Sequence, residues 1–188
     1  MMPQREIQGQ QGWGGLFRDS RTHTQLIYAD YYGYTINNEF KFAAIKQGLQ
    51  IAIRMGYRNI VVEGDSSLVI NTLTKLNHDI KWDKLSHSSR TSRLIQEIGE
   101  LIHNFDYIMA NHVRWEGNKA TNFLANWKSS HQNNPMEKIW PIQPWNKHYQ
   151  ALEEILEQDQ RQIFQHAQPI GQTPNQGVSR WITSLRPC

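Results

Sequence analysis

The sequence predicts an α/β fold in which a mixed sheet is flanked by helices. Residues 12–34 gather aromatic and β-favouring side chains on both sides of a turn at 18–20, which predicts a hairpin of two strands. Residues 59–62 (Asn-Ile-Val-Val) form a short apolar strand after a helical segment, and such a strand is typical of a buried parallel sheet. Strands that alternate with helices in this way favour the α/β class.

Apolar residues at spacings of three and four predict the helices. The first helix opens at Asn37 and Asn38, whose side chains suit a helix cap, and it stops at Gly56. The later elements are expected, in chain order, as a helix over 68–76, a helix over 89–105, a strand over 107–113 and a helix over 118–130.

Composition divides the chain into three regions. Residues 1–11 carry few apolar side chains, so we expect a disordered arm. Residues 12–131 form the compact α/β domain, and 132–188 begin with a linker rich in proline and tryptophan. Within that last region, residues 147–166 repeat apolar side chains at helical spacing, which predicts a C-terminal helix followed by a loose tail.

The overall composition excludes some classes of protein. The mean hydropathy is -0.68, and no apolar run approaches the roughly 20 residues of a membrane span, so we expect no membrane partner. The first residues lack the apolar core of a secretory signal, and the single cysteine, Cys188, cannot form an internal disulfide. We therefore expect an intracellular protein of the nucleus or cytoplasm. The net charge of +3 suits a polyanionic partner without requiring one.

Four sequence patches follow one another in a distinctive order. The first is Gly-Trp-Gly-Gly-Leu-Phe-Arg-Asp at 12–19, and the second is Thr-Ile-Asn-Asn-Glu at 35–39. The third is Val-Val-Glu-Gly-Asp-Ser at 61–66, and the fourth is His-Val-Arg-Trp-Glu-Gly-Asn-Lys-Ala at 112–120. Together they closely resemble the plant, retroelement-type ribonuclease H domain, a relative of type-1 ribonuclease H. The resemblance covers about 12–127 and does not extend to the C-terminal stretch.

The resemblance implies hydrolysis of the RNA strand of an RNA–DNA hybrid by two Mg²⁺ ions. Because Mg²⁺ prefers oxygen ligands, the family holds the ions with acids on the first strand, in the first helix, at the end of the strand before the second helix, and in the last helix. Asp65 matches the third position, while Lys41 and Asn122 stand where the two helix acids belong. The strand for the remaining acid is missing from the predicted elements. The resemblance thus implies an N-terminally truncated copy with a degenerate active site.

Lys41 is the most consequential of these changes. An ammonium group in the cluster repels Mg²⁺ and attracts the carboxylate of Asp65. We therefore expect a contact between Lys41 and Asp65 in place of a metal, which makes Asp65 a doubtful metal ligand. Among neighbouring acids, Glu116 is the best substitute ligand, whereas Glu39 points about 200° away from Lys41 around the helix.

Several of these residues also have ordinary interpretations. His112 matches a residue that assists general acid–base catalysis. An equal alternative is an ordinary histidine at a strand end whose hydrogen bonds are made within the protein. Asn37 and Asn38 match contacts to the minor groove and 2′-hydroxyls of a hybrid, although helix capping ranks first. Asp65 can instead cap the second helix. The basic residues expected on solvated faces are Arg18, Arg54, Arg58, Lys119 and Lys128.

The missing strand affects the fold as well as the site. In the family this strand is central and bonded on both sides, so its loss would leave two strand edges unpaired inside the protein. Three outcomes stay open: other residues fill the position, the neighbouring strands close up, or the chain folds poorly.

The sequence supports three functional hypotheses. We expect a degenerate ribonuclease H-like domain that binds nucleic acid without cleaving it, with Mg²⁺ implied by the resemblance but not bound by this copy. The second hypothesis is an active metal-dependent RNA–DNA hybrid endoribonuclease that uses Asp65, Asn122 and an unconventional ligand. The third is a protein-interaction module that works through 140–163.

Overall fold

The computed structural model describes residues 9–21, 23–35, 39–78, 89–114, 119–131, 133, 136–139, 147–166 and 179–184. In chain order, their elements are β1 (Gly9–Arg18), β2 (Thr24–Thr35), α1 (Glu39–Arg54), β3 (Asn59–Gly64), α2 (Ser67–Asn77), α3 (Ser89–Ile102), β4 (Tyr107–His112), α4 (Lys119–Ser130), β5 (Met136–Ile139), α5 (Lys147–His166) and β6 (Ser179–Ser184).

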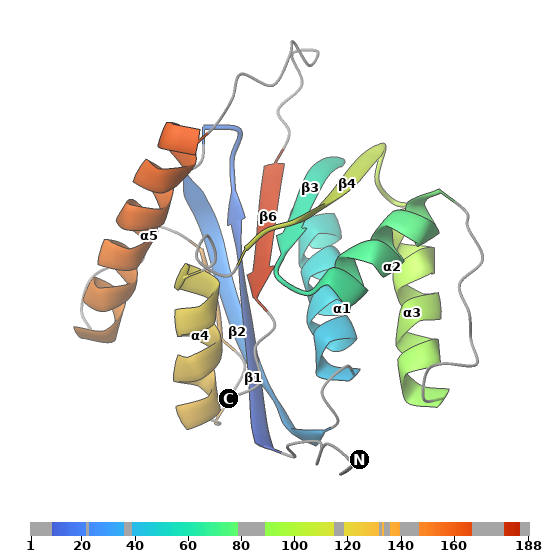
Figure 1. Ribbon diagram of the computed structural model, residues 1–188, viewed down its shortest axis with the longest axis horizontal. Helices are drawn as coiled ribbons and strands as arrows, with labels where there is room; N and C mark the ends of the chain where they lie inside the picture. The colour runs from blue at the N-terminus through green and yellow to red at the C-terminus, as the bar shows by residue number, and fades with distance from the viewer. Residues whose placement is uncertain are drawn as a thin grey trace, which may run out of the picture.

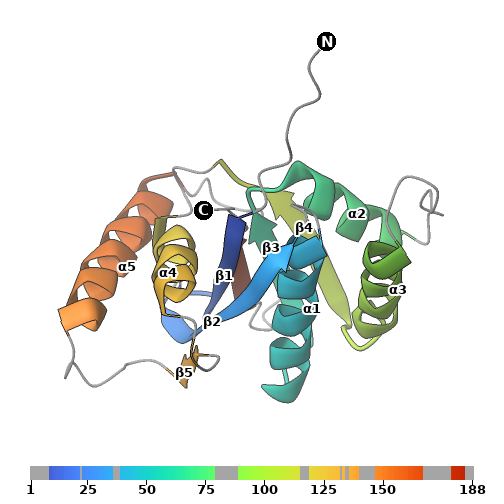
Figure 2. The same cartoon turned by 90° about the horizontal axis from the view of Figure 1, so that it is seen from below.

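The strands form one mixed sheet, and helices cover both of its faces. Figures 1 and 2 show α1, α2 and α3 on one side of the sheet and α4 and α5 on the other. This arrangement confirms the predicted α/β fold. None of the helices in the described part of the chain is long and apolar enough to cross a membrane.

The predicted hairpin is present and is longer than expected. β1 and β2 pair in antiparallel orientation from Gly9 opposite Thr35 to Arg18 opposite Thr24, with a register shift between Gln11 and Gly12. Main-chain pairing continues on both sides of this shift, as it does around a β-bulge, so β1 starts before residue 12. The prediction of a disordered arm is therefore wrong for residues 9–11, and residues 1–8 lie outside the described residues.

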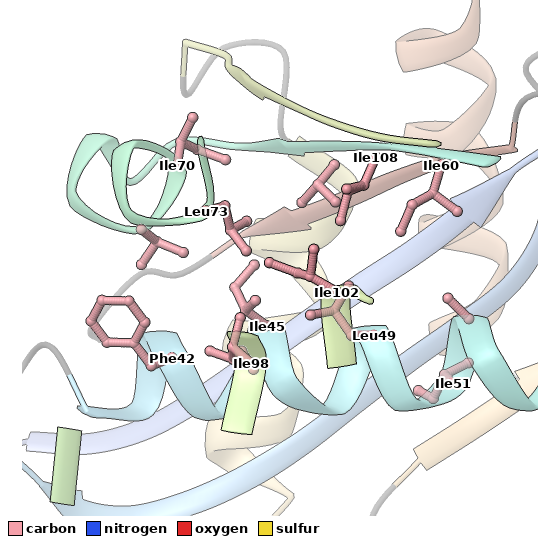
Figure 3. Close-up of a cluster of buried hydrophobic side chains, with 14 of the residues drawn as sticks. Phe42, Ile45, Leu49, Ile51, Ile60, Ile70, Leu73, Ile98, Ile102 and Ile108 are labelled. Atoms are coloured by element: carbon pink, nitrogen blue, oxygen red, sulfur yellow. The ribbon is translucent and has the colours of Figure 1, made fainter. Parts of the chain in front are cut away.

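The larger core lies between the sheet and helices α1, α2 and α3. Figure 3 shows Ile45 and Leu49 of α1 beside Ile98 and Ile102 of α3, and all four side chains are buried. Each such side chain contributes about 1.5–3 kcal/mol through its removal from water. This packing fixes α1 against the sheet and so positions the first turn of α1 near the end of β3.

A smaller core joins the opposite face of the sheet to α4 and α5. Leu16 and Ile27 from the hairpin meet Leu124 of α4, with Leu152 and Leu156 of α5 in the same buried cluster. The apolar stripe predicted on the C-terminal helix is therefore used inside this domain.

The C-terminal region supplies two further strands of the sheet. β5 pairs with β2, and the strand order is β4-β3-β6-β1-β2-β5. β6 thus lies between β3 and β1 (Figure 1), so other residues fill the central position, as the first of the three open outcomes requires. The prediction of a loose tail is wrong for Ser179–Ser184. An isolated strand draws its stability from pairing with distant strands, which local sequence patterns do not report.

Two basic residues are buried rather than solvated. Arg18 is 1% exposed and lies 3.9 Å from the carboxylate of Asp159 on α5. Lys128, also 1% exposed, donates a hydrogen bond to the main-chain oxygen of Asn133 at 3.1 Å. The expectation of solvated faces is therefore wrong for these two, because polar partners brought by the C-terminal region make burial possible. The other three are exposed: Arg54, Arg58 and Lys119.

Asp159 connects three elements of the smaller core. Its carboxylate faces Arg18 of β1 and accepts a hydrogen bond from the main-chain nitrogen of Ala120, at 3.2 Å, in the first turn of α4. Burial raises the pKa of Asp159, while the Ala120 bond and the charges of Arg18 and Lys119 act in the opposite direction. Asp159 therefore holds α5 against both the sheet and the start of α4.

Replacing Asp159 with Ala would leave the Arg18 guanidinium buried without this carboxylate. We expect D159A to lower the free energy of unfolding by about 3–5 kcal/mol, and the apolar double variant R18M/D159L to recover most of that loss. Urea denaturation followed by circular dichroism measures both changes.

Arg161 provides the matched control, because it forms an exposed pair with Glu157 on the same helix at 3.7 Å. R161A should cost less than about 1 kcal/mol. Equal losses for D159A and R161A would contradict the role given to Asp159.

Candidate functional site

Asp65 directly follows β3, at the edge of the sheet where two parallel strands end together. Gly64 of β3 lies level with His112 of β4. Asp65 is half-buried, and the N-cap of α2 is the next residue, Ser66. The cap interpretation of Asp65 therefore does not hold. The carboxyl ends of parallel strands are the usual place for ligands in α/β sheets, so Asp65 lies where a site is expected.

Lys41 lies in the first turn of α1 and is electrostatically coupled to Asp65. Its side chain is half-buried. The pKa of Lys41 is lowered from its ordinary value, chiefly by burial, while the negative charge of Asp65 raises it. A cation and an anion therefore lie within electrostatic range of each other at two positions where the resemblance implies acids.

Glu39 is directed away from this site. It is 8% exposed, and its carboxylate lies 3.2 Å from the guanidinium of Arg90 on α3. Two residues along a helix correspond to about 200° of rotation, so Glu39 and Lys41 cannot point the same way. Glu39 thus helps to join α1 to α3 and does not replace the acid absent at Lys41.

His112 contacts the main chain of the acid rather than its carboxylate. Its Nε2 atom lies 3.2 Å from the main-chain oxygen of Asp65, and its ring is exposed. The next residue, Val113, donates a main-chain hydrogen bond to the oxygen of Gly64 at 2.9 Å. When Nε2 carries the proton, His112 donates to Asp65 and fastens the end of β4 to the turn between β3 and α2.

Gly14 allows α4 to pack directly on β1. A Cβ atom at Gly14 would lie 2.6 Å from Cβ of Leu124 and 3.2 Å from the main-chain oxygen of Thr121. Real Cβ atoms do not approach so closely, so a glycine is required here. Asn122 follows Thr121 and is half-buried. The close approach at Gly14 therefore sets the position of Asn122 relative to the sheet.

The described residues lack the usual donors of a metal site. Among them, no group of three or more His, Cys, Asp or Glu side chains could hold a metal ion. The predicted contacts Asn37 and Asn38, and the substitute acid Glu116, lie outside the described part of the chain. The structure thus brings His112 to the main chain of Asp65, places Lys41 within electrostatic range of that acid, and holds the helix that carries Asn122 on β1.

The sequence reasoning missed Asp159, although a signal was present. The apolar stripe of α5 runs through Leu152 and Leu156, and the next position on the same face is Asp159. An acid in line with an apolar stripe indicates a buried polar partner. That partner is Arg18, whose position after an apolar strand gave no comparable signal.

The lowered pKa of Lys41, which its burial causes, predicts a pH effect on stability. Since the folded state lowers the pKa of Lys41, unfolded chains bind the proton of this ammonium group more tightly. The free energy of unfolding should therefore rise as the pH increases through the folded pKa towards 10.5.

Substituting Asp65→Asn removes the negative charge that raises the pKa of Lys41, so this pKa should fall further. Lysine-selective NMR titration measures this value. An unchanged or higher pKa in D65N, or an equal fall in the distant variant D106N, would refute the coupling.

Comparison with known proteins places the chain in a family. The sequence pattern of the reverse transcriptase-like family matches residues 5–128. No curated protein matches the sequence. Among solved structures, ribonuclease H1 from the halophilic archaeon Halobacterium salinarum is similar at 25% identity with a TM-score of 0.58, over 68% of this chain and 90% of that one.

Two further structures share the fold at lower identity. The N-terminal RNase H domain of a Mycobacterium tuberculosis protein, solved as a fusion with maltose-binding protein, has 20% identity, a TM-score of 0.59, and coverage of 68% of this chain and 88% of that one. LC9-RNase H1, a type 1 RNase H with the type 2 active-site motif, has 15% identity, a TM-score of 0.59, and coverage of 86% and 80%. Since the family pattern spans more than half of the chain, the protein belongs to the reverse transcriptase-like family and contains a ribonuclease H-like domain.

Proposed function

We propose that this chain is a ribonuclease H-like domain that binds nucleic acid, with RNA–DNA hybrid as the preferred class, and does not cleave it. The observation that carries the proposal is a half-buried lysine, Lys41, within electrostatic range of Asp65. Cleavage by two metal ions needs a cluster of carboxylates to hold the ions. The positive charge of an ammonium group within that cluster would repel both ions.

The charges of the three matched positions support this conclusion. Lys41 contributes +1, Asp65 contributes -1 and Asn122 contributes none, so the sum is zero where the family has three negative charges. The donor set therefore does not fit a pair of Mg²⁺ ions. It also argues against the active endoribonuclease, for which Asn122 would have to replace an anionic ligand with a neutral amide oxygen.

Exposed basic residues next to the site support binding to a polyanion. Arg114 lies two residues beyond β4, and Lys119 begins α4; both are exposed. Cationic side chains beside a strand-end site suit contacts with phosphates, which supply most of the sequence-independent affinity for nucleic acids.

The interaction-module alternative has weaker support. Leu152 and Leu156 of α5 are buried against the domain's own sheet and α4, so this part of the stripe is not an open surface. Residues 140–146 lie outside the described residues.

A labelled RNA–DNA hybrid tests the proposal. We expect binding that weakens steeply with salt, and no cleavage with Mg²⁺ or Mn²⁺. Replacing Arg114 with Ala should weaken binding and reduce the slope of log affinity against log salt by about 1. R54A is the matched control, because Arg54 is also exposed but lies in the last turn of α1, far from Lys41 in the first.

Two outcomes would overturn the proposal. Turnover that D65N abolishes, and that D106N retains, would show an active enzyme. Binding that is absent, or insensitive to salt, would remove nucleic acid as the partner and favour a protein-interaction module.

A further inference from the structure

We propose that β6 takes the place of the family's first strand, so that residue 184 stands at the position of the family's first metal-binding acid. The inference deepens the proposed function, because it supplies the fourth position of the same site. It also accounts for the position of β6 between β3 and β1 in the sheet.

The pairing of β6 matches that of a central strand. It runs antiparallel to β1, with Gly14–Arg18 opposite residues 180–184, and parallel to β3, with Ile60–Gly64 opposite residues 179–183. A strand that led into β1 through a tight hairpin would have the same antiparallel orientation to β1. β6 therefore occupies the central position in the expected direction but reaches it from the C-terminal side of the chain (Figure 1).

The register of β6 places its last residue within the site. Thr183 lies level with Gly64, so Ser184 is the residue beside Asp65. On the other side, Ser184 lies level with Gly14, where the Cβ direction meets α4. Residue 184 is therefore located between Asp65 and the helix that carries Asn122.

The chemistry of this position agrees with the loss of metal binding. Residues 179–188 contain neither Asp nor Glu, and position 184 is a serine. The four family positions thus hold Ser184, Lys41, Asp65 and Asn122, which provide a single carboxylate. Under this assignment, the position of the first acid carries the hydroxyl group of a serine.

Rebuilding the acids on the full-length chain tests this assignment. The background variant K41E/N122D restores the two helix acids, and the added substitution is either Ser184→Asp or Thr183→Asp. Neighbouring positions of a strand alternate between the two faces of the sheet, so the two substitutions test opposite faces. Mn²⁺ affinity, measured by electron paramagnetic resonance, reports metal binding without any requirement for turnover.

We expect S184D to tighten Mn²⁺ binding by at least about tenfold over the background, because ligand charge sets the affinity for a hard cation. T183D should leave the affinity unchanged. Equal effects, or a larger effect of T183D, would overturn the assignment of residue 184. Failure of the wild-type chain to bind a hybrid would refute the proposed function alone, since the metal comparison does not depend on it.

A second measurement keeps the inference testable if the acid-rich variants do not fold. Proline in a central strand removes a main-chain donor from the sheet, so Ile182→Pro should lower Tm by about 10 °C. Gln176→Pro, outside β6, serves as the control and should cause a smaller shift. Equal shifts for the two variants would show that β6 does not occupy the central position.

Discussion

The main-chain hydrogen bonds of β6 to its two neighbours determine how the rest of the molecule is assembled. β6 separates the parallel pair β3–β4 from the antiparallel strands β1, β2 and β5, and it is the strand through which these two groups join. Unpaired main-chain groups at both edges would be costly in the interior. β6 therefore completes a sheet whose other described strands all lie within residues 9–139.

The site depends on this assembly because its residues come from both groups of strands. Asp65 and His112 lie at the ends of β3 and β4, while Gly14 holds α4, with Asn122, against β1. The backbone thus has the geometry of a strand-end site, and among the matched residues Lys41, Asp65 and Asn122 only Asp65 is an acid. In the function that we propose, Lys41 balances the charge of Asp65 where a metal ion would do so in the family, and an ammonium group cannot activate water as a metal ion does.

The elements between β1 and α4 could be predicted from the sequence, because turn residues and apolar periodicity are local signals. The positions of Lys41 and Asp65 were predictable for a different reason, since sequence patches placed them in register with a family. The role of Ser179–Ser184 could not be predicted, because a lone strand is defined by partners more than a hundred residues away. The burial of Arg18 could not be predicted for the same reason, because its partner Asp159 lies on a helix that is far away in the sequence.

If a lysine has taken the place of the metal ion at this site, a Mn²⁺ titration of the wild-type chain should reveal no binding there. Bound Mn²⁺ broadens the NMR signals of nearby amides, so the amides of Gly64, Asp65 and Ser66 report on the site. We expect no selective broadening of these signals at Mn²⁺ concentrations up to about 1 mM, a range in which many carboxylate sites bind divalent cations. Selective, saturable broadening at Asp65 below that concentration would contradict it.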